Sequence, residues 1–209
     1  MNSSSSLKRI LIITLLVIAF TACLAGLPGT LLNRKAEPPQ ATAESTAAGG
    51  KRAIFSIPTP AKVYYKINGS TETDLAKEIQ SKGPDGYAGY TNWYIRWGWP
   101  GFGHEQCDLT KAWITAKVSM TMPSWDPPYN APEDLIRNWN RFNQALNTHE
   151  RGHVNNLVKA LPLLQTAIQN SDCITADSAA NQVLNKLRGW DVQYDDKTDH
   201  GRTEGAVFP

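Results

Sequence analysis

Two histidines and a glutamate in the second half of the chain have the spacing of a metal-dependent hydrolytic site. His149, Glu150 and His153 belong to the run His149-Glu150-Arg151-Gly152-His153, an H-E-x-x-H motif. Residues at i and i+4 of a helix lie on the same side, so the two imidazoles can share one metal ion. Glu150 is then close enough to act as general base on a water at that ion, as in zinc peptidases. The motif predicts a Zn²⁺ site with Glu150 as the catalytic residue.

A catalytic zinc site needs a third protein ligand in addition to these two histidines. His200 is the only histidine after His153 and lies in a polar, turn-rich tail that follows a predicted helix end at Gly189. We expect His200 to be the third ligand. Four carboxylates stay open as alternatives: Asp195, Asp199, Asp172 and Asp177. Tyr194, in the same tail, is a candidate hydrogen-bond donor to the oxyanion of a substrate.

The pattern of apolar residues indicates which elements position these groups. Apolar residues recur at helical spacing from Leu135 to Leu164, which predicts a long helix over residues 132–161 that carries the motif. Apolar and polar residues alternate between Ile114 and Met122, as in an antiparallel strand with one buried face. The other expected elements are strands over 62–67 and 92–97, the start of the third strand at 107, a short helix ending at Gly83-Pro84, and a helix over 175–188. The predicted fold class is α+β, with a small antiparallel sheet packed against the motif helix and a second, C-terminal helix.

The beginning of the chain resembles an export signal. Lys8 and Arg9 precede an apolar run that reaches residue 20, and the small residues before Cys23 resemble the lipobox of bacterial lipoproteins. Three outcomes stay open for residues 1–32: lipidation at Cys23, ordinary cleavage near Ala25, and an uncleaved membrane span. All three place the rest of the chain outside the cytoplasm, in the cell envelope or beyond it.

Composition separates this signal from the folded part and excludes one class of partner. Residues 33–53 are rich in Ala, Pro, Glu, Thr, Ser and Gly, so we expect a flexible linker followed by one domain over 54–209. The chain has 21 Lys and Arg against 19 Asp and Glu, but four of the basic residues precede residue 36, which leaves 17. Without a basic excess, we expect no nucleic-acid partner.

The cysteines agree with an exported domain. When Cys23 is assigned to the signal region, Cys107 and Cys173 remain as a pair. Disulfides form and persist in oxidising compartments outside the cytoplasm. We therefore expect a Cys107–Cys173 disulfide.

The motifs, taken in order, resemble a bacterial family catalogued as domain of unknown function 922, which is described as predicted secreted zinc-dependent proteases. The resemblance covers residues 63–209 and rests on these features: Trp93 and Trp97, Met122-Pro123-x-Trp125, His149-Glu150-Arg151-Gly152-His153, and Tyr194-Asp195-x-x-Thr198-x-His200-Gly201. It implies a zincin-like metallopeptidase with His149 and His153 as ligands and Glu150 as catalyst, and it favours His200 as third ligand. In zincins an edge strand pairs with the extended substrate, and residues 111–122 are the candidate for that strand.

The function expected from the sequence is an exported, membrane-tethered zinc metallopeptidase that hydrolyses peptide bonds. Its expected partners are a peptide or protein substrate and, through the N-terminal segment, the membrane. A metal-dependent amidase acting on peptidoglycan would use the same chemistry. The alternative from a different class is a non-catalytic cell-envelope binding module in which the metal is structural or absent.

Overall fold

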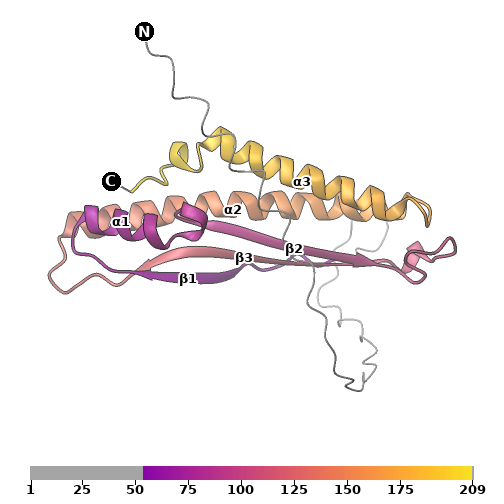
Figure 1. Ribbon diagram of the computed structural model, residues 1–209, viewed down its shortest axis with the longest axis horizontal. Helices are drawn as coiled ribbons and strands as arrows, with labels where there is room; N and C mark the ends of the chain where they lie inside the picture. Colours follow the sequence, from indigo (N-terminus) through magenta and orange to yellow (C-terminus); the bar gives the residue numbers. More distant parts are fainter. Residues whose placement is uncertain (1–53, 209) are drawn as a thin grey trace, which may run out of the picture. The chain divides into compact units, whose positions relative to one another are not determined.

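The structure, a computed structural model, describes residues 54–208. Its main elements are β1 (Ala61–Ile67), α1 (Glu72–Lys82), β2 (Tyr90–Gly98), β3 (Trp113–Trp125), α2 (Glu133–Gln169) and α3 (Ala176–Thr198). Short 3₁₀ turns occur at η1 (Pro84–Gly86), η2 (Leu109–Lys111) and η3 (Arg202–Glu204). The fold is α+β, with two long helices beside a three-stranded sheet (Figure 1). The predicted export signal, the lipidation site Cys23 and the linker over 33–53 lie outside the described residues.

The sheet is mixed, so the prediction of an antiparallel sheet is wrong in one strand pair. The strand order is β1-β3-β2, with β2 antiparallel and β1 parallel to β3. Parallel neighbours need a long crossover connection, and here α1 and β2 lie in the chain between β1 and β3. The order also makes β3 the central strand. The segment 111–122 is therefore not the edge strand that we expected, and β2 and β1 form the two edges of the sheet.

Local patterns were better guides than strand order. In α1, Thr71 caps the helix by accepting a hydrogen bond from the Asp74 N–H, and the helix ends at Lys82 before Gly83, as expected. In β3 the predicted inward residues Ile114, Ala116, Val118, Met120 and Met122 are buried or half-buried. The strand also continues through Pro123. The described pairing with β2 ends at Thr121, so beyond this residue β3 is an edge on that side, where a proline without an N–H is tolerated.

Both long helices extend beyond the predicted ends. α2 continues through Pro162 to Gln169, although a proline inside a helix costs roughly 3 kcal/mol. The apolar stripe continues past the proline, and the fully buried Leu164 and Ile168 supply packing that offsets this cost. α3 continues through Gly189 to Thr198, so the predicted tail loop is largely helical. Figure 1 shows the two helices side by side and running in opposite directions.

The core consists of two hydrophobic clusters that divide α2 between them. The first joins the C-terminal half of α2, from Val154 to Ile168, to α3, β2 and β3. The second joins the N-terminal half of α2, from Leu135 to Leu146, to α1 and to the ends of β1 and β3. Each fully buried leucine contributes on the order of 2 kcal/mol, so both halves of α2 are held firmly. The H-E-x-x-H motif occupies the polar interval between the two clusters.

The predicted disulfide is present. Cys107 and Cys173, which are 66 residues apart, join the segment before β3 to the turn between α2 and α3. A disulfide of this kind indicates an oxidising, extracytoplasmic compartment. Within residues 54–208, no helix combines the length and hydropathy needed for a bilayer crossing.

Candidate metal centre

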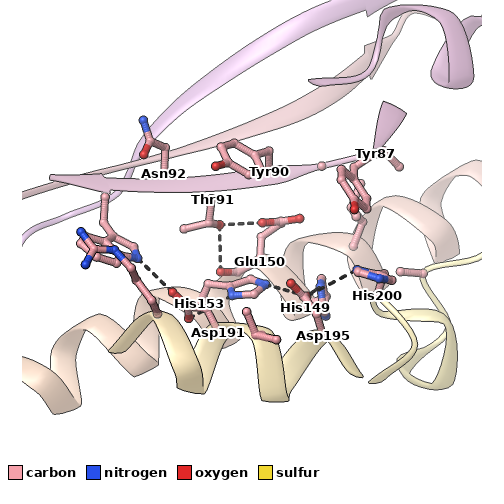
Figure 2. Close-up of a pocket in the computed structure, with 17 residues that line it drawn as sticks. Tyr87, Tyr90, Thr91, Asn92, His149, Glu150, His153, Asp191, Asp195 and His200 are labelled. Atoms are coloured by element: carbon pink, nitrogen blue, oxygen red, sulfur yellow. Dashed lines mark hydrogen bonds and ion pairs between the residues drawn. The ribbon is translucent and has the colours of Figure 1, made fainter. Parts of the chain in front are cut away.

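The three residues of the motif are buried in the middle of α2. His149, Glu150 and His153 are 4%, 3% and 9% exposed, although polar groups of this kind are rarely buried without partners. They face a cavity of about 520 Å³. Figure 2 shows this cavity between β2 and α3, with α2 behind it.

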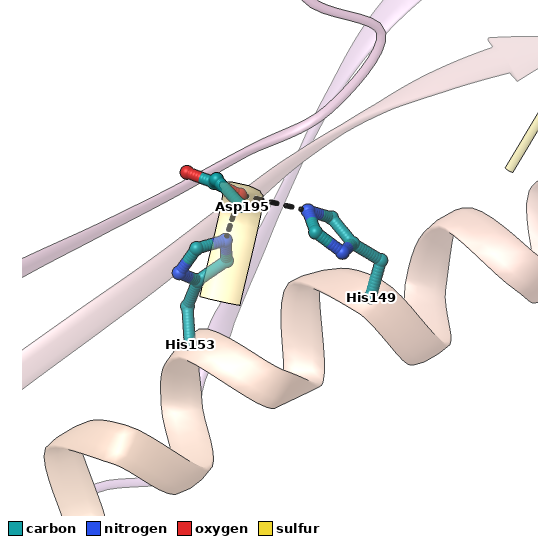
Figure 3. Close-up of side chains that lie close together, drawn as sticks. All are labelled: His149, His153 and Asp195. Atoms are coloured by element: carbon teal, nitrogen blue, oxygen red, sulfur yellow. Dashed lines mark hydrogen bonds and ion pairs between the residues drawn. The ribbon is translucent and has the colours of Figure 1, made fainter. Parts of the chain in front are cut away.

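A carboxylate from α3 completes the group. The Asp195 Oδ1 atom lies 3.2 Å from the Nε2 atom of His149 and 3.1 Å from the Nε2 atom of His153 (Figure 3). One ligand atom from each residue falls within 4.8 Å of the other two, so the three side chains could hold a single metal ion. Asp195 was one of the alternatives to His200, and the extension of α3 is what brings its side chain to α2.

The outward nitrogen of each histidine also meets a carboxylate. His149 Nδ1 lies 3.0 Å from Glu204 Oε2, in η3, and His153 Nδ1 lies 3.1 Å from Asp191 Oδ1, one helical turn before Asp195 on α3. Such contacts fix the ring orientation and the tautomer, so that both Nε2 atoms can face a shared ion. Sequence reasoning missed Glu204 and Asp191. The i, i+4 spacing of Asp191 and Asp195, which matches that of the two histidines, is a signal that could have identified Asp191.

Asp191 is held by several donors at once. Asn156 Nδ2 donates to its Oδ1 atom at 3.0 Å, and Trp93 Nε1 donates to its Oδ2 atom at 2.9 Å. Burial alone would raise the pKa of Asp191, but these hydrogen bonds and that of His153 lower it overall. For His153, burial opposes the charged form, while the Asp191 hydrogen bond and the nearby carboxylates raise its pKa. The carboxylate of Asp191 therefore remains ionised beside the ring it orients.

Glu150 lies against the start of β2. Thr91 Oγ1 contacts both the Glu150 Oε2 atom, at 2.6 Å, and the Glu150 carbonyl oxygen, at 3.1 Å. Burial raises the pKa of Glu150, and the Thr91 hydrogen bond partly opposes the shift. A Cβ atom at Gly89 would lie only 2.7 Å from Glu150 Oε1, so a glycine is needed where the strand approaches this carboxylate.

Tyr194 supports the site from behind and is not among the residues that line the cavity. Its hydroxyl lies 2.9 Å from both carboxylate oxygens of Glu204, to which it donates. Its ring stacks on that of His149, with centroids 5.0 Å apart and planes 14° apart. Burial and the Glu204 hydrogen bond raise the pKa of Tyr194, which keeps the hydroxyl protonated. The hydroxyl predicted to meet a substrate oxyanion is thus engaged by Glu204.

His200, the ligand favoured by the sequence, lines the cavity beside the group of three. Its Nδ1 atom lies 3.9 Å from Asp195 Oδ1, its side chain is 51% exposed, and its ring is 5.2 Å from that of Tyr87. A role for His200 as a ligand stays a prediction. The other carboxylate alternatives have partners elsewhere: Asp199 pairs with Arg202, Asp172 with the backbone N–H of Thr175, and Asp177 with Trp97 Nε1.

Comparison with known proteins places the chain in a family without giving it an activity. No curated protein and no solved structure matches it. A model of a family described as a bacterial protein of unknown function, DUF922, matches residues 62–201. The matched segment covers most of the domain and contains His149, His153 and Asp195. The chain therefore belongs to the DUF922 family of bacterial proteins.

Proposed function

We propose that this protein is an extracytoplasmic, zinc-dependent peptidase tethered to the membrane by its N-terminal segment. The observation that carries the proposal is the convergence of His149 Nε2, His153 Nε2 and Asp195 Oδ1 beside the buried Glu150. A motif helix that packs under a sheet edge, with the third ligand on the following helix, is a zincin-like arrangement.

The donor set fits zinc. Two imidazole nitrogens and one carboxylate oxygen are ligands that zinc prefers, and the carboxylates on both outward Nδ1 atoms are the usual support for such ligands. A set of three protein ligands leaves one position open, which is typical of catalytic and not of structural zinc sites. The cavity in front of the group gives that position access to a substrate.

Glu150 is the residue that moves protons. Zinc, when bound, supplies a Lewis acid that polarises the substrate carbonyl and lowers the pKa of a coordinated water. Glu150 accepts the proton of the attacking water and delivers it to the amine that leaves when the C–N bond breaks. Thr91 holds the carboxylate in place, and the raised pKa of Glu150 suits a group that must both take and return a proton.

The edge strand β2 is the element that would bind the peptide. Among the strands that the structure describes it pairs only with β3, and the residues from Tyr87 to Trp93 line the cavity. An extended peptide can add to such an edge through main-chain hydrogen bonds. β2 takes the role that the sequence assigned to residues 111–122, because β3 is already paired on both sides.

The test combines zinc analysis with peptide hydrolysis by the purified full-length protein. We expect Glu150→Gln to keep one zinc ion per chain and to lose hydrolysis of unstructured protein and peptide substrates. His149→Ala and Asp195→Ala should lose both zinc and hydrolysis. Asp196→Ala, which removes an exposed carboxylate next to Asp195, is the matched control and should keep both.

His200→Ala separates the proposal from the binding-module alternative. With three ligands, this variant retains zinc. Loss of zinc in both Asp195→Ala and His200→Ala would indicate four protein ligands and a closed, structural site. That result, or full hydrolysis by Glu150→Gln, would contradict the proposed function.

A further inference from the structure

Arg188 gives one end of the cavity a charge opposite to that of its centre. Among the cavity-lining residues of the described segment 54–208, it is the only lysine or arginine. Glu150, Asp191 and Asp195 line the same cavity and make its centre acidic. Arg188 lies on α3, on the same helix as the two aspartates.

The Arg188 guanidinium has neighbours that position it but forms no ion pair with a carboxylate among the described residues. Its Cζ atom lies 5.7 Å from the ring centroid of Trp93, and its Nη1 atom donates to Asn185 Oδ1 at 2.9 Å. In the described part of the chain, no carboxylate forms an ion pair with it. Asp191, one turn further along α3, bonds instead with His153, Asn156 and Trp93. A cation–π contact with a tryptophan ring favours this placement of the guanidinium while its remaining N–H donors stay available.

Trp93 also positions the Arg188 guanidinium relative to the candidate metal site. It lies on β2 and contacts both Asp191 and Arg188 of α3, so the two walls of the cavity meet at this residue. Arg188 precedes Asp195 by seven residues, or two turns of α3, which corresponds to about 10 Å along the helix axis. An extended peptide advances about 3.3 Å per residue, so this distance corresponds to about three residues.

We propose that Arg188 binds a carboxylate of the substrate about three residues from the hydrolysed bond, making the protein selective for acidic peptides. The inference rests on the proposed function, since it describes the substrate of the same site. Guanidinium and carboxylate form paired, charge-assisted hydrogen bonds. The carboxylate can belong to an acidic side chain or to the free C-terminus of the peptide, and both present the same chemistry to Arg188.

The test compares matched peptides on the full-length zinc-loaded protein. One series is blocked at both ends and carries Glu, Gln or Lys at two to four residues on either side of the cleavable bond. A second series is neutral and has either a free or an amidated C-terminus. We expect kcat/KM to be about tenfold higher with the carboxylate than with its amide, corresponding to about 1.4 kcal/mol. Whichever series shows the preference identifies the source of the carboxylate.

Charge reversal then assigns the preference to one residue. Arg188→Gln should bring the ratio of kcat/KM between the Glu and Gln peptides to about one. Arg188→Glu should make the Lys peptide the preferred substrate of the series. Lys186→Glu is the matched control, because it makes the same charge change on an exposed residue of α3 that does not line the cavity. An unchanged ratio in both Arg188 variants, or an equal change in Lys186→Glu, overturns the assignment.

A binding measurement separates this inference from the proposed catalysis. Glu150→Gln is used to measure the affinity for labelled Glu and Gln peptides by fluorescence anisotropy, with and without Arg188→Glu. If no peptide is hydrolysed by the wild type but the Arg188-dependent preference in affinity is present, the catalytic proposal fails and the carboxylate site stands. If hydrolysis occurs without a preference in rate or affinity, the carboxylate site fails alone. Absence of both hydrolysis and binding overturns both.

Discussion

The ring of Tyr194 occupies the space that a side chain at Gly152 would need. A Cβ atom at position 152 would lie 2.2 Å from Tyr194 Cζ and 2.3 Å from its hydroxyl oxygen. A glycine inside a helix costs up to about 1 kcal/mol relative to alanine, so its presence between the two histidines of the motif calls for a reason. The reason is that α3 can bring Tyr194 and Asp195 to the motif only where α2 has no side chain.

We expect Gly152→Ala to destabilise the protein although alanine favours helices. The added methyl group must displace the Tyr194 ring and with it the Glu204 hydrogen bond, and overpacking of this kind costs about 1–3 kcal/mol. Zinc affinity should fall as well, because Asp195 follows Tyr194 directly. Urea unfolding and zinc titration measure the two effects.

Gly189→Ala is the matched control for this substitution. Gly189 lies inside α3, where an added Cβ atom would have no neighbour within 4 Å. The same change should therefore stabilise the protein by up to about 1 kcal/mol and leave zinc affinity unaltered. Equal effects of the two substitutions would show that helix propensity, and not the contact with Tyr194, controls position 152.

The carboxylates behind the histidines should contribute to metal affinity without touching the metal. Glu204→Ala and Asp191→Ala each leave one histidine of the motif without the acceptor on its Nδ1 atom. Loss of such an acceptor typically weakens metal binding by about 10–100-fold. Competition with a chromophoric chelator measures the dissociation constant, with Arg202→Ala, an exposed residue of the same turn as Glu204, as the control. A Glu204→Ala constant equal to that of Arg202→Ala would argue against the positioning role.

The disulfide should supply a large part of the stability of the domain. Closing a loop of 66 residues in the unfolded chain corresponds to about 4 kcal/mol on the chain-entropy model. Replacement of Cys107 and Cys173 by serine should lower the free energy of unfolding by up to that amount. Cys23→Ser is the control, since it leaves the pair intact. Identical urea midpoints for the double variant and the control would mean that the loop is already constrained in the unfolded state.

The parts of the site that could be predicted from the sequence are those that depend on local spacing. His149, Glu150 and His153 share a helix, so one periodicity was enough to place them together. The end of α1 before Gly83 and the buried face of β3 are local in the same sense. In each case a few neighbouring residues contain the complete signal.

The parts that were missed depend on contacts between distant residues. α3 continues past Gly189 because Asp191, Asp195 and Thr198 pack against α2 through polar contacts, which hydrophobic periodicity does not register. The support of Glu150 by Thr91 spans 59 residues and arises only once β2 lies beside α2. The order of the strands is likewise nonlocal. The hydrophobic pattern of β1 does not identify β3 as its partner.

Tyr65, a half-buried residue of β1, connects the sheet to the wall of the cavity through its hydroxyl group. It donates a hydrogen bond of 2.7 Å to the Ala88 carbonyl oxygen, next to Gly89 and within the segment that lines the cavity. Burial raises the pKa of Tyr65 from its usual value near 10 to about 12. The folded protein therefore favours the neutral hydroxyl more strongly than the unfolded chain does.

This difference predicts a loss of stability at alkaline pH that depends on Tyr65. Below pH 10 the residue is neutral in both states, and its contribution to the free energy of unfolding is constant. Between pH 10 and about 12 the unfolded chain releases the proton first, so that contribution falls with rising pH. The total fall is less than the roughly 2.7 kcal/mol that two pKa units correspond to, because the side chain is only half-buried and solvent screens part of the effect. Tyr65→Phe keeps the ring and removes the titration. Urea unfolding from pH 9 to 12 should show the wild type losing stability relative to Tyr65→Phe across this window, whereas parallel curves would mean that Tyr65 ionises alike in both states.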